Sequence, residues 1–483
     1  EVDFTPLDVK SSYSLLKSPT RISDLVTTAK ERGYKALALT DENVLYGAVE
    51  FYNAAKKAGI KPILGLRLVV ALNETDGTKL DLVFLAKNQR GYQHLMDLST
   101  LQQTRKDKKI PLTIAQISPL LGELFIIIPP QSTVFSILAQ PTSILTELAN
   151  LGDDDSVLLG VNSRLDDVQI DTLQQLSKQL SLPLVGTSPV DYLNANDLFA
   201  SRVLQAIDAG VELKDPTIEA GRRGQHYLHS KEQIVQDYNA KGLSAAAQKT
   251  VEVAALCNVE LQFRAPVLPH FKNQAGIPSQ QYLRSLCIQG LKKRRVAPGK
   301  TIQQYQERLA MELKVIHEMG FDDYFLIVWD VMNFAHQQKI TTDPGRGSAA
   351  GSLVAYALAI TEVDPLQYDL LFERFLNPER AQMPDIDLDI PDNRRDEVLQ
   401  YVHQKYGHQR VAQIITFGTL AAKQVVRDVS RVFNLPRYDM QRLIDALPHG
   451  LHVTLKDALK ESQQLKNLLD DNPKFRLLIQ VAQ

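Results

Sequence analysis

The sequence has little cysteine, one tryptophan and no long apolar run. Its two cysteines, Cys257 and Cys287, lie in apolar helical patterns, which argues against a disulfide framework and favours buried reduced thiols over a zinc site. No stretch approaches the roughly 18 apolar residues of a transmembrane helix. The first residues also lack the pattern of a signal peptide. We therefore expect a cytoplasmic protein with no membrane partner.

Neither sign of charge is in large excess, because the net charge is only −2. This value alone gives no indication of a nucleic-acid partner. The hydrophobic fraction of 44% and the charged fraction of 23% are those of a chain with proper cores rather than a disordered one. A length of 483 residues suggests about three domains.

Short apolar runs alternate with helical patterns over the first 190 residues or so. Runs typical of strands lie at 36–40, 62–70, 82–86, 125–128, 157–161 and 182–186. Amphipathic stretches such as 47–59 and 171–180 separate them. This alternation predicts a mostly parallel sheet, and its repetition predicts a barrel. Asp41 directly follows the first run and is a candidate site residue, because barrel chemistry lies at strand C-terminal ends.

Later in the chain the pattern is helical from about 195 to 340, and again from about 417. The helices that we expect in the first of these regions include 243–257, 279–295 and 302–318.

Three aspartates alternate with aliphatic residues in the run 383–390. This period of two predicts a strand in which Asp385, Asp387 and Asp389 project from one side, about 6.5–7 Å apart. Neighbouring carboxylates repel one another unless a cation offsets the repulsion. Hard oxygen ligands favour Mg²⁺, Mn²⁺ or Ca²⁺ over zinc. The alternative is the acidic, exposed face of an edge strand.

A glycine-rich turn at 344–352 precedes an apolar helical pattern. Such a turn exposes backbone N–H groups at a helix start, where the helix dipole favours phosphate. Arg346 adds a guanidinium that can hold phosphate oxygens with two hydrogen bonds. Arg374 and Arg380 come shortly before the aspartates, although arginines there could equally form structural salt bridges. Together, these features indicate nucleotidyl transfer with two divalent ions.

The run 344–402 closely resembles the palm of the bacterial replicative DNA polymerase III alpha subunit, a C-family polymerase. The resemblance extends through 413–433 and back to residue 4, and its details resemble the DnaE form of low-GC Gram-positive bacteria. It implies a PHP-type distorted β/α barrel over 1–262, a nucleotidyltransferase-like mixed α/β palm over 263–416 and a helical thumb segment over 417–483. The fingers would lie beyond it.

The resemblance implies a DNA-directed DNA polymerase that transfers a nucleotide from a dNTP to a primer 3′-hydroxyl by a two-metal mechanism. Asp385 and Asp387 would be two of three catalytic, metal-binding aspartates, with two Mg²⁺ ions. Arg346, Gly347, Ser348, Arg374 and Arg380 would bind the nucleotide. The third catalytic aspartate of the family is in a segment that this chain does not contain, so we expect the chain to be inactive alone.

On a helix after residue 417, Lys423, Arg427 and Arg431 lie at i, i+4 and i+8 on one face. The resemblance implies that this face meets the primer–template backbone; the alternative is a solvated basic stripe. The other partners it implies are the sliding clamp and further replisome subunits, mostly through regions outside this chain.

The barrel departs from the pattern of metal-loaded PHP domains. The alternating histidines of the first strand are replaced by a stretch with Asp8 and Lys10, and an Asp-His pair by Asp41 and Glu42. Arg67 stands near an expected glutamate, and Asp191 where a histidine is expected. A lysine places positive charge where a cation would sit. We therefore expect no metal in this domain.

Salt bridges such as that between Asp8 and Arg67 are the expected substitute. A single weakly bound cation at Asp8, Asp41 and Asp191 is the alternative. Two rival functions remain for the chain, a metal-dependent PHP phosphoesterase and a non-catalytic scaffold.

Overall fold

The computed structural model describes residues 2–75, 78–130, 143–380, 382–450 and 452–483. It divides into two compact units, one of residues 1–262 with 418–483 and one of residues 263–417. The sequence-based domains assign 417–483 to a separate thumb, and that functional assignment stays a prediction. No helix in the described parts of the chain is long and apolar enough to cross a membrane.

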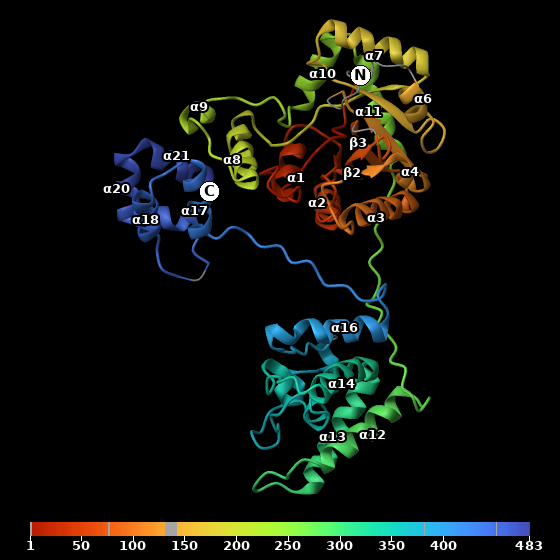
Figure 1. The fold of residues 1–483 in the computed structure, drawn as a ribbon, viewed down its shortest axis with the longest axis vertical. Helices are drawn as coiled ribbons and strands as arrows, with labels where there is room; N and C mark the ends of the chain where they lie inside the picture. The colour runs from red at the N-terminus through yellow and green to blue at the C-terminus, as the bar shows by residue number, and fades with distance from the viewer. Residues whose placement is uncertain (1, 76–77, 131–142, 381, 451) are drawn as a thin grey trace. The chain divides into compact units, whose positions relative to one another are not determined.

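The first unit is built on a curled, mixed sheet of seven strands among the described residues (Figure 1). They are β1 (Ala36–Leu39), β2 (Lys61–Ala71), β3 (Lys79–Ala86), β4 (Leu112–Thr113), β5 (Leu124–Ile128), β6 (Val157–Val161) and β7 (Leu184–Gly186). The order is β1-β2-β3-β5-β6-β7, with β4 beside β2. All six predicted strands are therefore present.

The prediction of a mostly parallel sheet is only partly right. β2 pairs antiparallel with β3, and β3 pairs antiparallel with β5, whereas β1–β2, β5–β6 and β6–β7 are parallel. The connection from β2 to β3 spans only 72–78, which is too short for the crossover helix that parallel neighbours require.

The first residues of the chain join the two edges of this sheet. The N–H groups of Ala38 and Thr40 donate to the carbonyls of Pro6 and Val9. On the other side, a parallel bridge connects Val9 with Val190 beyond β7. The sheet thus curls into the distorted barrel that the sequence predicts.

Helices and a large apolar cluster surround the sheet. The helices of this part are α1 (Ile22–Glu31), α2 (Ala48–Ala58), α3 (Gln89–Gln103), α4 (Ile114–Ile117), α6 (Ser143–Ala149), α7 (Asp167–Leu180), α8 (Leu198–Ala209), α9 (Pro216–Ala220), α10 (Lys231–Ala240) and α11 (Ser244–Leu256). Their apolar faces pack on strand residues such as Leu66 and Phe84, which are inaccessible to solvent. Burial raises the pKa of the Cys257 thiol to about 12, so this cysteine is an inert core residue.

The C-terminal helices complete the first unit. They are α17 (Ala422–Val432), α18 (Arg437–Asp445), α19 (Leu455–Glu461), α20 (Gln463–Asp471) and α21 (Pro473–Ala482). They share an apolar cluster with α8, in which Phe199 lies 6.0 Å from Phe433 between ring centroids. This shared core explains why 418–483 groups with 1–262.

The second unit is helical. Its longer helices are α12 (Ser279–Lys292), α13 (Ile302–Glu318), α14 (Asp322–Gln337) and α16 (Arg395–Tyr406), and its short ones are η3 (Gly347–Gly351), α15 (Leu353–Ala357), η4 (Phe372–Arg374), η5 (Pro378–Arg380) and η6 (Asp392–Arg394). Among its described residues no strand occurs, so the strand predicted at 383–390 is not formed. Alternating side chains set two faces, but a strand also needs a series of backbone hydrogen bonds to a neighbouring strand. Within the described residues this run has one such bond, from the Asp343 N–H to the Asp389 carbonyl at 3.4 Å.

Candidate functional site

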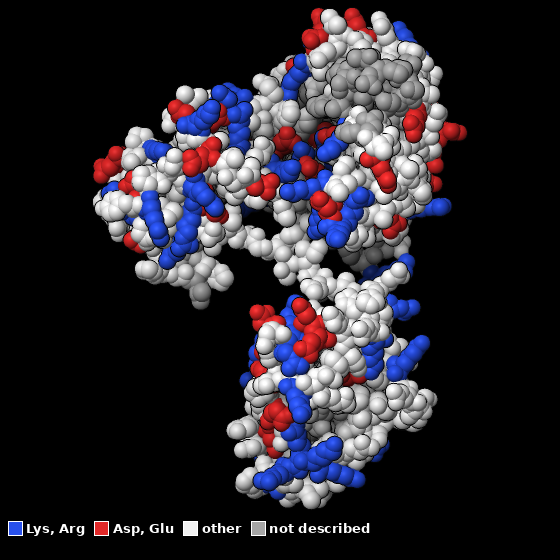
Figure 2. All heavy atoms as spheres, viewed as in Figure 1, with Lys and Arg blue, Asp and Glu red and all other residues white. Residues whose placement is uncertain are grey.

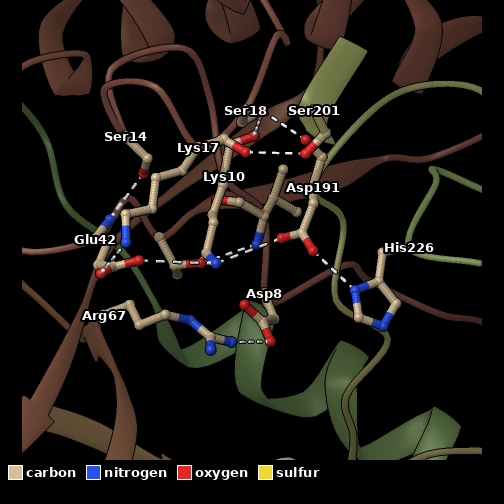
Figure 3. Close-up of polar contacts among 12 residues, drawn as sticks. Asp8, Lys10, Ser14, Lys17, Ser18, Glu42, Arg67, Asp191, Ser201 and His226 are labelled. Atoms are coloured by element: carbon tan, nitrogen blue, oxygen red, sulfur yellow. Dashed lines mark hydrogen bonds and ion pairs between the residues drawn. The ribbon is translucent and has the colours of Figure 1, made fainter. Parts of the chain in front are cut away.

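Two groups of charged residues stand out, one in the barrel and one beside the glycine-rich loop. In the barrel, Arg67 of β2 donates to Asp8 (Figure 3). It also donates to Asp81 of β3. Arg67 is 6% and Asp8 2% exposed, so this ion pair is shielded from solvent. Burial acts to lower the pKa of Arg67, but the charges of Asp8 and Asp81 outweigh it and raise the pKa. The predicted ion pair between Asp8 and Arg67 is present.

The Lys10 ammonium lies between two carboxylates (Figure 3). Its Nζ is 3.6 Å from Asp191 and 3.9 Å from Glu42, and Lys17 approaches Glu42 to 3.3 Å. His226 Nδ1 lies 2.8 Å from the other oxygen of Asp191. Burial acts to raise the pKa of Asp191, but His226 and Lys10 outweigh it and lower the pKa.

Asp41 differs from these ion-paired residues, because its hydrogen-bond donors are hydroxyl groups and a backbone N–H. It is 2% exposed and accepts from the Ser11 N–H at 2.6 Å, the Ser11 hydroxyl at 2.8 Å and the Ser14 hydroxyl at 2.8 Å. Burial raises its pKa, and these hydrogen bonds act against that shift.

The three aspartates proposed for a weak cation therefore have different partners. Asp8 forms an ion pair with Arg67, and Asp41 accepts hydrogen bonds from the serines. Asp191 pairs with Lys10 and His226. Among the described residues no group of three or more His, Cys, Asp or Glu could hold a metal ion. In this arrangement, cationic side chains balance the charge of the carboxylates. Figure 2 likewise shows acidic and basic side chains interspersed on the visible face of the barrel.

In the second unit, the run of aspartates keeps its two faces without forming a strand. Asp385, Asp387 and Asp389 are exposed, whereas Ile386 and Leu388 are half-buried against the apolar cluster of this unit. The N–H of Ile386 donates to the Tyr324 hydroxyl of α14 at 3.1 Å, which fixes the run on the helical body.

Arg346 of the glycine-rich loop reaches two of these aspartates. Its Nη1 lies 2.7 Å from Asp387, and its Nε lies 2.7 Å from Asp389. The hydrogen bond from Arg346 lowers the pKa of Asp389 and raises the pKa of Arg346. The loop and the aspartates, about 40 residues apart in sequence, thus meet at one exposed place.

Two glycines of the loop have a conformation that side chains disfavour. Gly347 has φ of 66° and Gly345 has φ of 103°, and a Cβ atom at Gly345 would lie only 2.7 Å from Thr361 Cγ2. Gly347 and Ser348 are exposed at the start of η3.

The helix start after the loop differs from the prediction that it would receive phosphate. The N–H groups of Leu353 and Val354 donate to the Glu312 carboxylate, at 2.8 and 2.9 Å, and the Ala355 N–H donates to the Ser352 hydroxyl at 3.1 Å. These donors of α15 are therefore already satisfied. Residues 346–348 are left as the part of the loop that could bind phosphate.

The remaining predicted site residues are exposed, except Lys423, which is half-buried. Arg374 and Arg380 end the short helices η4 and η5, and within the described residues neither forms an ion pair with the three aspartates. Lys423, Arg427 and Arg431 lie along α17, whose opposite face is apolar. Arg431 also pairs with the buried Asp428 of the same helix. Basic side chains gather on the visible face of the C-terminal helices (Figure 2).

Sequence reasoning missed three participants, Asp81, His226 and Glu312. The signal for Asp81 would have been its place as the one acid in the apolar strand β3. The signal for Glu312 would have been a charged residue on the apolar stripe of α13, where Tyr305, Leu309 and Ile316 are also buried. For His226 no local pattern existed.

Two family models match this chain. Residues 6–121 match the PHP domain, and residues 281–483 match the bacterial DNA polymerase III alpha NTPase domain. Strands β1 to β4 of the barrel fall in the first region and the loop–aspartate group falls in the second. The chain therefore joins a region that matches the PHP domain to a region that matches a polymerase-subunit domain.

Curated relatives are similar to this chain along nearly its whole length. The DNA polymerase III subunit alpha of Halalkalibacterium halodurans is 40% identical over 99% of this chain and 42% of its own length. That of Bacillus subtilis is 39% identical over 100% of this chain and 43% of its own length. Over the region that it spans, the chain is similar to bacterial DNA polymerase III alpha subunits. It spans about two fifths of the length of these relatives.

Among solved structures, an amidohydrolase from Chromobacterium violaceum is similar with a TM-score of 0.28 and 12% identity, over 39% of this chain and 87% of that chain. This likeness is too weak to carry a conclusion about function.

Proposed function

We propose that this chain is the PHP, palm and thumb portion of a replicative DNA-directed DNA polymerase of the cytoplasm. The complete protein transfers a nucleotide from a dNTP to the 3′-hydroxyl of a primer paired with template DNA. The observation that carries the proposal is the meeting of Arg346 with Asp387 and Asp389 in the region similar to the polymerase subunit. Phosphate-binding and cation-binding groups must be adjacent for this reaction.

Asp385 and Asp387 are the carboxylates that we assign to divalent cations, with Mg²⁺ as the natural ion. Their donor set fits, because exposed carboxylate oxygens are the ligands that Mg²⁺ prefers. Bound cations would supply Lewis-acid stabilisation of charge on the reacting phosphate. When no cation is bound, Arg346 offsets the repulsion between the neighbouring aspartates.

The nucleotide-binding role belongs, in this proposal, to Arg346, Gly347 and Ser348, with Arg374 and Arg380 nearby. Arg346 can exchange a carboxylate for phosphate oxygens, since guanidinium forms similar paired hydrogen bonds with both. The positive φ of Gly347 turns the loop without the strain of a side chain.

DNA contact is assigned to the basic face of α17, with Lys423, Arg427 and Arg431. The sliding clamp and other replisome subunits are further partners, mostly through regions outside this chain. The barrel is assigned no metal and no nuclease role. A PHP phosphoesterase is the weaker candidate, because cationic side chains hold the carboxylates of its site.

The test is Mg²⁺-dependent primer extension by the full-length protein, with Asp387→Asn beside Asp396→Asn. Asp396 is an exposed aspartate in the first turn of α16, so its variant controls for loss of one surface charge. We expect Asp387→Asn to lower the rate of incorporation about a thousandfold or more, since several kcal/mol of transition-state stabilisation depends on a metal ligand. Equal rates for the two variants would contradict the assignment.

A further inference from the structure

Glu312 is a charged residue in the core of the second unit. It lies on α13 and is 0% exposed, although an ionised carboxylate is among the groups most costly to bury. Burial raises the pKa of Glu312, and the Leu353 and Val354 N–H groups and Arg308 act against that shift. Such a group persists in a core when donors converge on it.

Three donors from the last residue of the glycine-rich loop and the first turn of α15 converge on this carboxylate. They are the N–H groups of Leu353 and Val354, at 2.8 and 2.9 Å, and the hydroxyl of Ser352, at 3.0 Å. Ser352 in turn accepts from the Ala355 N–H. Glu312 thus holds the first turn of α15, directly after the loop.

Arg308, one turn before Glu312, extends the network to the loop itself. Its Nε lies 2.7 Å from Glu312. Its Nη2 donates to the carbonyls of Gly351, at 2.7 Å, and Leu370, at 3.0 Å. The pair therefore connects α13, the last residue of η3 and the segment before η4.

The other end of the loop has its own anchors. The Gly345 N–H donates to Asp343 at 2.7 Å, and the Glu362 N–H donates to the Pro344 carbonyl at 2.8 Å. The loop is fixed at both ends, so the backbone at Gly347 keeps its positive φ before any ligand binds. A binding loop that is already ordered loses less entropy on binding.

We propose that Glu312 and Arg308 are a positioning pair that fixes the glycine-rich loop for the triphosphate of the incoming nucleotide. The inference rests on the proposed function, because the nucleotide is the substrate named there. Neither residue touches the reacting atoms. Their effect is transmitted through the Gly351 carbonyl and the first N–H groups of α15.

The experiment measures dNTP dependence of single-nucleotide incorporation by the full-length protein. The variants are Glu312→Gln and the milder Ser352→Ala, and the control is Glu307→Gln, an exposed glutamate on the same helix. Glutamine keeps the shape but places an amide against N–H donors. We expect the apparent KM for dNTP to rise about tenfold in Glu312→Gln and about threefold in Ser352→Ala, as expected for lost charge-assisted hydrogen bonds, with kcat changed less.

A second variant separates positioning from stability. Glu312→Gln leaves the charge of Arg308 without its partner, whereas Glu312→Gln with Arg308→Met removes both charges. We expect the double variant to regain thermal stability but to keep the raised KM. If the KM returned to the wild-type value together with stability, the role would be structural only and the inference would be wrong.

The outcomes also separate the inference from the proposed function. A wild-type protein that extends no primer overturns both. A wild-type protein that extends primers, with Glu312→Gln and Ser352→Ala equal to Glu307→Gln in KM, overturns the positioning role alone.

Discussion

Replacing Arg67 with methionine should strongly destabilise the barrel. Asp8 is 2% exposed and would lose its cationic partner, whereas Asp81, at 27% side-chain exposure, can still reach water. Removing one member of a buried ion pair typically costs about 3–5 kcal/mol, because the other charge stays buried without compensation. We expect that cost for Arg67→Met. For Arg90→Met, which removes an exposed arginine of α3, we expect a change within about 0.5 kcal/mol.

The assay must report on the barrel separately. The only tryptophan, Trp329, lies on α14 in the second unit, so its fluorescence does not follow unfolding of the sheet. Amide hydrogen exchange of peptides from β2 and β3 follows unfolding of the sheet directly. A loss of about 3–5 kcal/mol corresponds to exchange that is faster by about two to four orders of magnitude there. The fluorescence transition of Trp329 should stay unchanged.

A double variant tests the cause of this effect. Adding Asp8→Asn to Arg67→Met removes the stranded charge, so at least half of the lost protection should return. If the double variant exchanged as fast as Arg67→Met, packing of the arginine stem rather than the ion pair would explain the loss. If Arg67→Met matched Arg90→Met, the reasoning about buried charge would be refuted.

Three further outcomes are expected. Asp191→Asn should lower the free energy of unfolding by about 1–2 kcal/mol at pH 7. Because the pKa of Asp191 is lowered in the folded state, its carboxylate stabilises the fold at pH values above the ordinary pKa of aspartate, and this stabilisation is lost as the pH falls. The difference from wild type in urea unfolding should therefore shrink from about pH 5 downward. Arg346→Ala should raise the apparent KM for dNTP about tenfold in steady-state incorporation, and an unchanged KM would remove Arg346 from the nucleotide site. Replacing Lys423, Arg427 and Arg431 together by glutamine should reduce the slope of log affinity for primer–template DNA against log salt by about one unit for each phosphate that these side chains neutralise, and an unchanged slope would mean that α17 is only a solvated stripe.

Much of the barrel was predictable from local patterns. The apolar runs became β1, β2, β3, β5, β6 and β7, because buried strands need continuous apolar sequence. The strand directions were not predictable from these patterns, because parallel or antiparallel pairing depends on the length of the connection, as the short link 72–78 shows. The partnership of Asp8 with Arg67 was predictable because a buried acid and a buried base must compensate each other.

The loop–aspartate site was predictable in composition but not in detail. Alternation at 385–389 correctly set which side chains are exposed, yet it could not supply a neighbouring strand. The glycine-rich turn suggested free N–H groups at a helix start, but Glu312, about 40 residues earlier, fills that position. Long-range interactions of this kind leave little trace in a single sequence beyond a charged residue on an apolar helix face.

Catalysis, in the function proposed above, belongs to the loop–aspartate site and not to the barrel. A single comparison distinguishes the two sites, namely Mg²⁺-dependent primer extension by three full-length proteins, which are wild type, Asp387→Asn and Lys10→Met. We predict extension by the wild type and by Lys10→Met, and none by Asp387→Asn. Extension by Asp387→Asn at the wild-type rate would show that catalysis does not depend on the loop–aspartate site.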